Sequence, residues 1–227
     1  MKIPRIYKNL SAYLKPNKVL LIYGPRQVGK TTLLQDFLSH SHLKYKLDSG
    51  DNIKVREIFE SQNFDTIKEY AAGYELIAID EAQKIPGIGA GLKILTDQIK
   101  GLKIIATGSS SFELAGQTGE PLTGRKFSLT LFPVSQMELL SFYNRLELQE
   151  KIGEWLVFGG YPEVVANHNK QEKVRLLEEL VSSYLLKDIL ELERVKSSKI
   201  VLDLLRLLAF QIGNEVSLSE LSTQLGI

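Results

Sequence analysis

The sequence contains no cysteine, which excludes both a disulfide framework and a thiolate metal site. An excess of one charge is also missing, because 28 lysines and arginines face 27 aspartates and glutamates, a net charge of +1. Such neutrality supplies no global field for holding nucleic acid, although it is compatible with a local basic patch. No apolar run reaches the roughly 18 residues that a membrane helix needs, and the N-terminus lacks the apolar core of a signal peptide. We therefore expect a soluble, cytoplasmic protein.

Short apolar runs alternate with helical patterns over the first two-thirds of the 227 residues. This alternation is typical of βα units that build a parallel sheet. Leu92, Leu95 and Ile99 recur at helical spacing, which predicts a crossover helix between two strands. The sequence predicts an α/β fold with a Rossmann-like three-layer core and a five-stranded sheet. A helix is predicted after the first strand, over residues 31–39. The five predicted strands are 19–23, 44–47, 76–79, 102–106 and 127–131.

The pattern changes after residue 133, where the strand signals stop. Ser135 and Glu138 form an S-x-x-E capping box, and Val134 and Leu139 are placed for a hydrophobic staple. Such a cap marks the start of a helix, and apolar residues recur at helical spacing beyond it. Only helices are predicted from there on, over 136–143, 147–157, 170–193 and 198–212.

A domain boundary is therefore predicted near residue 133. It separates an α/β core over residues 1–133 from an all-helical lid over residues 134–212. Residues 213–227 contain a second capping box, from Ser217 to Glu220. Two interpretations of this last segment stay equally open, namely a final packing helix and the start of a winged helix-turn-helix domain.

One loop fits the phosphate-binding pattern G-x-x-x-x-G-K-[ST] without a mismatch. Its glycines let backbone N–H groups turn toward phosphate oxygens, and the helix that begins at Lys30 adds its dipole. Lys30 is a point charge for the β- and γ-phosphates, and the Thr31 hydroxyl is a magnesium ligand. Arg26 is expected to hold the loop's shape or to touch a phosphate. The nucleotide-binding candidates here are Gly24, Pro25, Arg26, Gln27, Val28, Gly29, Lys30, Thr31 and Thr32.

Two carboxylates, Asp80 and Glu81, follow the apolar run 76–79. An aspartate at a strand end beside a phosphate loop can hold Mg²⁺, directly or through water. The Glu81 carboxylate can polarise a water aligned on the γ-phosphate, as a general base does. The guanine-reading N-K-x-D motif is missing. The pair therefore favours ATP hydrolysis over phosphoryl transfer to an acceptor or a GTP switch.

Hydroxyl groups end the strand predicted at 102–106, and an arginine precedes the last strand. Ser109, with Thr107 as second choice, is predicted to orient the attacking water; the alternative is a hydroxyl-rich turn. Arg125 is predicted to stabilise transition-state charge, either within its own chain or across a subunit boundary. The alternative for Arg125 is a surface salt bridge.

The segment 159–163, GGYPE, lies between two predicted lid helices. Two glycines and a proline predict a sharp, rigid turn. The turn is either a simple helix breaker or a device that presses Pro162 or Tyr161 against an adenine.

Together these segments resemble the AAA-type predicted ATPases of bacteria and archaea. The resemblance is carried by GPRQVGKTTLL, LIAIDEAQKIP, IIATGSSS, L-x-G-R, LFPVSQMEL and FGGYPEVV, in this order along nearly the whole chain. It implies an ASCE-division P-loop core with sheet order 5-1-4-3-2, a helical lid and then a winged helix. It also implies Walker A, Walker B and sensor roles for Lys30, Thr31, Asp80, Glu81 and Ser109. The turn at 160–162 is similar to the G-x-P motif of signal-transducing ATPases with numerous domains.

The resemblance predicts a Mg²⁺-dependent ATPase that binds ATP and ADP and moves its lid or an attached effector domain. Family members usually continue well beyond this length, so the chain is expected to be a fragment. An unknown protein or DNA partner would then bind through the missing C-terminal region, and a homo-oligomer is an open alternative to a monomer. Two other functions stay open: a slow nucleotide-gated regulatory switch, and a nucleic-acid-binding module with a secondary nucleotide site.

Overall fold

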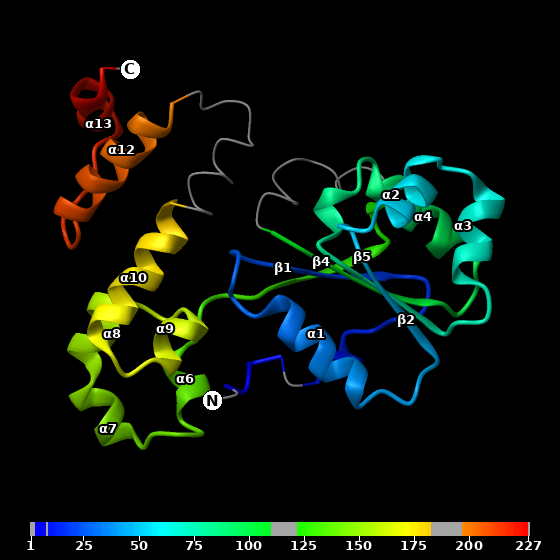
Figure 1. Ribbon diagram of the computed structural model, residues 1–227, viewed down its shortest axis with the longest axis horizontal. Coiled ribbons are helices and arrows are strands. Elements are labelled where there is room, and N and C mark those ends of the chain that lie inside the picture. Colours follow the sequence, from blue (N-terminus) through cyan, green and yellow to red (C-terminus); the bar gives the residue numbers. More distant parts are fainter. Residues whose placement is uncertain (1–2, 8, 110–121, 183–196, 227) are drawn as a thin grey trace. The chain divides into compact units, whose positions relative to one another are not determined.

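The chain divides into two compact units, Met1–Asn169 and Lys170–Ile227, each of which is described by itself. The first unit carries the sheet and the helices around it, and the second carries helices (Figure 1). The residues that the computed structural model describes are 3–7, 9–109, 122–182 and 197–226.

Five parallel strands form one sheet in the order β2-β3-β4-β1-β5. This order, read from the other edge, confirms the predicted α/β fold and the sheet order 5-1-4-3-2. Each predicted strand lies within two residues of an observed one. The observed bounds are Val19–Tyr23 for β1, Tyr45–Ser49 for β2, Leu76–Asp80 for β3, Lys103–Gly108 for β4 and Lys126–Thr130 for β5.

Four helices connect the first four strands. Asn52 and Asn63 begin the second and third of them, because each asparagine side chain accepts hydrogen bonds from backbone N–H groups of the first turn. The fourth is the predicted crossover helix between β3 and β4. The periodicity of the sequence did not locate the second and third helices individually, since each has only eight residues. The bounds are Lys30–Ser39 for α1, Ile53–Glu60 for α2, Phe64–Ala71 for α3 and Ile88–Gln98 for α4.

Helices cover both faces of the sheet, and alternate side chains of each strand pack against opposite layers. In β1, Val19 and Leu21 belong to the core formed with α2, α3 and α4. Their neighbours Leu20 and Ile22 belong to the core formed with α1. Figure 1 shows α1 on one side of the sheet, apart from α2, α3 and α4. The central strands are continuously apolar because both of their faces are buried.

Four short helices follow β5 within the first unit. Ser135 and Glu138 form the predicted capping box, with both reciprocal hydrogen bonds present. Val134 and Leu139 lie in one buried cluster, as expected for a hydrophobic staple. The bounds are Gln136–Leu139 for α6, Arg145–Glu150 for α7, Ile152–Phe158 for α8 and Pro162–Ala166 for α9.

The single helix predicted over 147–157 was wrong, because the structure has two helices there. Asn144 forms a capping box with Glu147, which starts α7 earlier than predicted. The chain then turns at Lys151, whose φ of −88° and ψ of 1° leave the helical region. The N-x-x-E pattern from Asn144 to Glu147 is the local sequence signal for this helix start.

The second unit contains α10 (Lys170–Leu180), α12 (Ser198–Phe210) and α13 (Leu218–Leu225). The predicted helix over 170–193 is observed as α10, and its continuation beyond residue 182 lies outside the described residues. Ser217 caps α13 by accepting a hydrogen bond from the Glu220 N–H. The winged helix and the domain boundary near residue 133 stay predictions.

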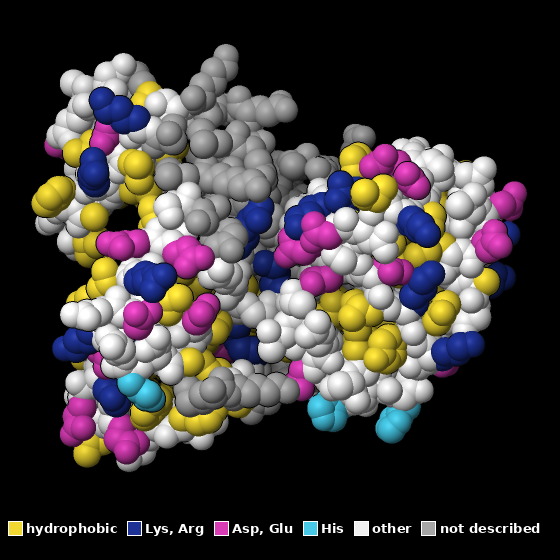
Figure 2. Space-filling view, viewed as in Figure 1, with side chains coloured by type: hydrophobic (Ala, Val, Ile, Leu, Met, Phe, Trp, Pro, Cys, Tyr) yellow, Lys and Arg dark blue, Asp and Glu magenta, His cyan; other side chains and the backbone are white. Residues whose placement is uncertain are grey.

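The surface of the molecule carries both charges. Figure 2 shows acidic and basic side chains interspersed on the visible face. In the described ranges, no helix combines the length and the hydrophobicity that a membrane crossing requires.

We predict that Phe59→Ala lowers the free energy of unfolding by about 3–5 kcal/mol, the usual cost of an aromatic-to-alanine cavity. Phe59 is fully buried, its ring meets Tyr70 edge-on at 5.2 Å, and a methyl group on Gly91 would come within 2.5 Å of it. Urea denaturation measures the loss. The matched control is Phe64→Ala, because Phe64 is 54% exposed. Equal unfolding midpoints for the two variants would contradict the assigned core.

Candidate nucleotide site

The phosphate loop lies between the end of β1 and the start of α1, at the carboxyl edge of the sheet. Gly24 is required there, because a Cβ atom on it would lie 2.1 Å from the Leu131 carbonyl oxygen. The Lys30 side chain is buried, and its Nζ donates to the carbonyl oxygens of Gly24 (3.0 Å) and Pro25 (2.8 Å). The loop therefore curls around its own lysine.

Asp80 is the last residue of β3 and accepts two hydrogen bonds from threonines. Thr31 Oγ1, in the first turn of α1, donates to Asp80 Oδ2 at 2.7 Å. Thr107 Oγ1, near the end of β4, donates to Asp80 Oδ1. The strand register explains why Thr107 lies beside Asp80. Ile79 of β3 pairs with Ala106 of β4, and the next residues are Asp80 in β3 and Thr107 in β4. A hydroxyl and a carboxylate oxygen thus converge, and both are the hard oxygen donors that Mg²⁺ prefers.

Glu81 follows Asp80 and adopts a left-handed backbone conformation with φ of 51°. This conformation costs a non-glycine residue about 1 kcal/mol and clusters at functional sites. The Glu81 N–H donates to Thr107 Oγ1 at 3.2 Å. Gln83 Nε2 donates to Glu81 Oε2 at 2.5 Å, which fixes the direction of the carboxylate. The strained turn and Gln83 together hold the glutamate in place.

Thr107, the second candidate for orienting the attacking water, lies beside Asp80 and Glu81. Thr107 is fully buried and bonds to both Asp80 and the Glu81 backbone. Ser109 follows β4 directly and is also buried, at the same edge of the sheet. Which hydroxyl orients a water stays a prediction.

The structure does not bring Arg125 to the phosphate loop of its own chain. Arg125 precedes β5, and its carbonyl oxygen accepts a hydrogen bond from the Val19 N–H at the start of β1. The loop lies at the other end of β1, about 13 Å away at the usual rise along a strand. Arg125 instead forms a half-exposed ion pair with Asp97, at 2.6 Å. A charge-stabilising role for Arg125 is then left only across a subunit boundary.

A cavity of about 620 Å³ lies beside the start of α1. Gly29 and Thr32 of the phosphate-loop segment line it, as do the acidic residues Asp36 and Glu163. Its wall also includes Arg5 from the N-terminal segment. Most of the lining is apolar and comes from Ile3, Pro4, Leu33, Phe37, Pro162 and Ala166.

Pro162 reaches this cavity because the 159–163 turn is anchored on the segment after β5. The Val134 N–H donates to the Gly160 carbonyl oxygen at 2.6 Å. A Cβ atom on Gly160 would lie 2.4 Å from the Val134 carbonyl oxygen, so the two backbones approach closely only with glycine there. Pro162 is then the first residue of α9. The turn contributes Pro162 to the cavity, while Tyr161 lies outside the lining.

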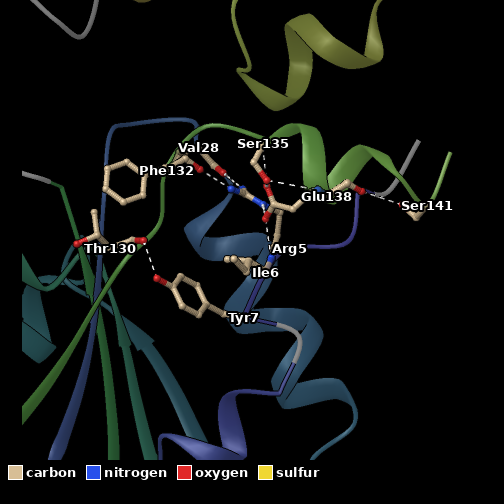
Figure 3. A network of polar contacts seen from close by, with 9 residues as sticks. All are labelled: Arg5, Ile6, Tyr7, Val28, Thr130, Phe132, Ser135, Glu138 and Ser141. Atoms are coloured by element: carbon tan, nitrogen blue, oxygen red, sulfur yellow. Dashed lines mark hydrogen bonds and ion pairs between the residues drawn. The ribbon is translucent and has the colours of Figure 1, made fainter. Parts of the chain in front are cut away.

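Arg5 was not found by the sequence analysis, although it contacts the phosphate loop directly (Figure 3). Its Nη1 donates to the Val28 carbonyl oxygen at 2.5 Å, and its Nη2 donates to the Phe132 carbonyl oxygen. Its Nε pairs with Glu138 Oε1 at 3.0 Å, and the Ile6 N–H donates to the same oxygen at 2.6 Å. No local signal marks Arg5, because its charged partner lies 133 residues away.

Glu138 is held in its charged form. Burial by itself would raise the pKa of this carboxyl group, but hydrogen bonds from the Ser135 N–H, Arg5 and the Ile6 N–H outweigh burial. The pKa of Glu138 therefore lies below its ordinary value of 4.5. The stability that the carboxylate contributes is complete above about pH 4.5 and is lost as the pH falls through the lowered pKa.

Two families of known proteins match parts of the chain. Residues 16–140 match a family described as AAA domain. Residues 149–227 match a domain of unknown function, DUF8612.

Individual relatives are similar over nearly the whole chain. An uncharacterized protein of Methanocaldococcus jannaschii is 25% identical over 97% of this chain and 53% of its own length. An uncharacterized protein of Haemophilus influenzae is 26% identical over 91% of this chain and 55% of its own length. The chain thus spans about half the length of these two relatives.

Among solved structures, the crystal structure of the FIGL-1 AAA domain in complex with ADP is similar to 62% of this chain and 49% of that chain. The TM-score is 0.40 and the sequence identity is 15%.

We predict that Thr107→Val lowers the free energy of unfolding by about 1–3 kcal/mol, because the half-buried Asp80 carboxylate and Glu81 N–H both lose the buried Thr107 hydroxyl as a partner. Valine has the shape of threonine, so the change removes the hydroxyl with little effect on packing. Urea denaturation measures the loss, and Thr123→Val, at an exposed position, is the control. An unchanged midpoint for Thr107→Val would show that the hydrogen bonds to Asp80 and Glu81 do not form.

Proposed function

The chain belongs to the AAA domain family, and from that premise we propose that it binds ATP with Mg²⁺ and hydrolyses it to ADP and phosphate. AAA domains are nucleotide-binding ATPase domains of the P-loop type. One observation carries the proposal for this chain: Lys30, the Thr31–Asp80 pair and Glu81 lie together at the carboxyl edge of the sheet. Ligands of open α/β sheets bind at this edge.

The phosphate loop would hold the triphosphate through its backbone and its lysine. The N–H groups at the start of α1 point along the helix axis, where they and the helix dipole favour an anion. Lys30 Nζ lies against the loop carbonyls of Gly24 and Pro25, and a phosphate oxygen would replace one of these acceptors. A charge-assisted bond to phosphate is stronger than a bond to a neutral carbonyl, so the exchange favours binding.

Thr31 and Asp80 fit the needs of a magnesium ion, because both present oxygen atoms and lie 2.7 Å apart. When bound, Mg²⁺ would supply positive charge that offsets the negative charge of the triphosphate. Thr107 fixes the second Asp80 oxygen and so keeps the carboxylate plane in position.

Glu81 would act as the general base. As a water oxygen forms its bond to the γ-phosphorus, Glu81 takes the water proton, and the bond from the γ-phosphorus to the bridging oxygen breaks. The electron pair of that bond leaves with ADP. Gln83 orients the Glu81 carboxylate through its Nε2. The strained Glu81 backbone keeps the side chain beside the strand end rather than in solvent.

The 620 Å³ cavity would take the adenine, since its volume lies in the usual range for small-ligand sites and its lining is mostly apolar. Pro162 and Phe37 can face the ring of the base. Because Pro162 starts α9, contact with the base would link nucleotide state to the helices after β5. An effector partner and a subunit-crossing role for Arg125 belong to the same proposal.

We predict that Lys30→Ala and Glu81→Gln separate binding from turnover. Lys30→Ala should weaken ATP binding about 100-fold by removing a charge-assisted bond. Glu81→Gln should bind ATP normally and lower phosphate release about 100- to 10,000-fold. Calorimetric titration with ATP and a phosphate-release assay with and without Mg²⁺ measure the two effects.

The control is Glu75→Gln, because Glu75 lies just before β3 at the opposite edge of the sheet. It should behave as wild type in both assays. Phosphate release that is independent of Mg²⁺, or unchanged in Glu81→Gln, would overturn the proposed mechanism.

For the base, we predict that Pro162→Ala weakens ATP binding about five- to tenfold through lost apolar contact. Alanine keeps α9 intact, so the change should leave binding of inorganic triphosphate unaltered. Titration of both ligands compares the two effects. Equal weakening of ATP and inorganic triphosphate would show that Pro162 does not contact the base.

A further inference from the structure

Arg5 binds three separate segments of the first unit through one guanidinium group. These are the phosphate loop at Val28, the segment after β5 at Phe132, and α6 at Glu138. Figure 3 shows the arginine in the middle of these contacts. The side chains of Arg5 and Glu138 are 9% and 5% exposed, so the ion pair is buried.

Stability alone does not account for a buried ion pair at this place. Removing two charges from water costs several kcal/mol, and an apolar pair of similar volume is often as stable or more stable. The charged pair instead fixes the directions of the hydrogen bonds that the guanidinium group donates. A planar guanidinium donates along fixed lines, and all three of its nitrogen atoms are used here.

The bond to Val28 fixes the orientation of the peptide unit between Val28 and Gly29. The Val28 carbonyl and the Gly29 N–H belong to one peptide unit, which is planar and trans, so the two groups point in opposite directions. Because Arg5 binds the carbonyl, the Gly29 N–H of the same peptide unit points away from the arginine. Arg5 also lies close to Gly29 itself, since a Cβ atom there would be 3.5 Å from Nη1.

The ion pair with Glu138 connects Arg5 to α6, the first helix after β5. Glu138 uses one oxygen for Arg5 and the Ile6 N–H, and its other oxygen accepts from the Ser135 N–H at 2.8 Å. The same carboxylate therefore caps α6 and holds the arginine. A rotation of the Val28–Gly29 peptide would shift Arg5, and Arg5 would shift the cap of α6.

We propose that Arg5, held by Glu138, is a positioning residue that orients the Gly29 N–H toward a nucleotide phosphate and transmits phosphate binding to α6. The proposal rests on the proposed function, because it assumes that the loop binds a polyphosphate. Arg5 acts through the Val28 peptide and does not touch the reacting atoms. Lysine cannot replace it, since one ammonium group cannot meet three acceptors in the same plane.

The test measures binding of inorganic triphosphate to the chain, a ligand without a base. Arg5→Lys should weaken triphosphate binding about tenfold, the cost of a misdirected amide donor to a charged acceptor. Arg206→Lys is the control, because Arg206 is an exposed arginine of α12. Triphosphate binding within twofold of wild type in Arg5→Lys would overturn the positioning role.

A second variant separates positioning from folding. The double change Arg5→Met with Glu138→Gln removes both charges together and keeps an amide oxygen that can accept from the Ile6 and Ser135 N–H groups, so the chain should stay folded and unfold cooperatively in urea. Triphosphate binding should nevertheless fall about tenfold, as in Arg5→Lys. Wild-type affinity in this stable double variant would contradict the proposal.

Trp155 reports the transmission to α6. It is the one tryptophan of the chain. It packs against the buried cluster that contains Val134, before α6, and Leu139, in α6. Saturating triphosphate should change its fluorescence in the wild type, and Glu138→Gln should abolish the change. A change of wild-type size in Glu138→Gln would contradict the transmission. If the wild type bound no triphosphate at all, the proposed function itself would fail, which is a different result from a normal Arg5→Lys variant.

Discussion

The site depends on the carboxylate of Asp80, which joins three consecutive strands of the sheet at their carboxyl ends. Asp80 ends β3, Thr107 comes from β4, and Thr31 belongs to the helix that follows β1. Both carboxylate oxygens accept a threonine hydroxyl. The phosphate loop, the metal-ligand candidates and the turn at Glu81 are therefore fixed relative to one another by one side chain. A shift of any of the three strands along its axis would break this arrangement.

A second set of contacts ties the helices after β5 to the same edge. Gly160 pairs with Val134, which brings Pro162 to the cavity beside the loop. Arg5 and Glu138 join the loop to the cap of α6. The base and the phosphates of a nucleotide would thus each meet a segment that leads into these helices. This double link is the physical basis on which nucleotide state could be coupled to movement.

The sequence was sufficient for the features that local patterns specify. Local motifs that begin or end at strands predicted the five strands and the contact between the phosphate loop and Asp80. The family resemblance predicted the order of the strands. Contacts between distant segments carry no such pattern, so Arg5 was missed. The distance of Arg125 from the phosphate loop could have been predicted from the sequence. A residue that precedes a parallel strand lies at the amino end of that strand, whereas the loop follows the carboxyl end of β1. The ranking of Ser109 above Thr107 stays a prediction, and local sequence patterns could not reveal the contact of Thr107 with Asp80, since it depends on the register between β3 and β4.

The central claim is that the carboxyl edge of this sheet binds Mg²⁺ and ATP in one defined orientation. A crystal structure with Mg²⁺ and a non-hydrolysable ATP analogue tests it most directly. The account predicts the triphosphate against Lys30 and the α1 N-terminus, the metal ion beside Thr31 and Asp80, and the base in the cavity next to Pro162. An analogue bound elsewhere, or a γ-phosphate out of reach of a water held by Glu81, would contradict the account.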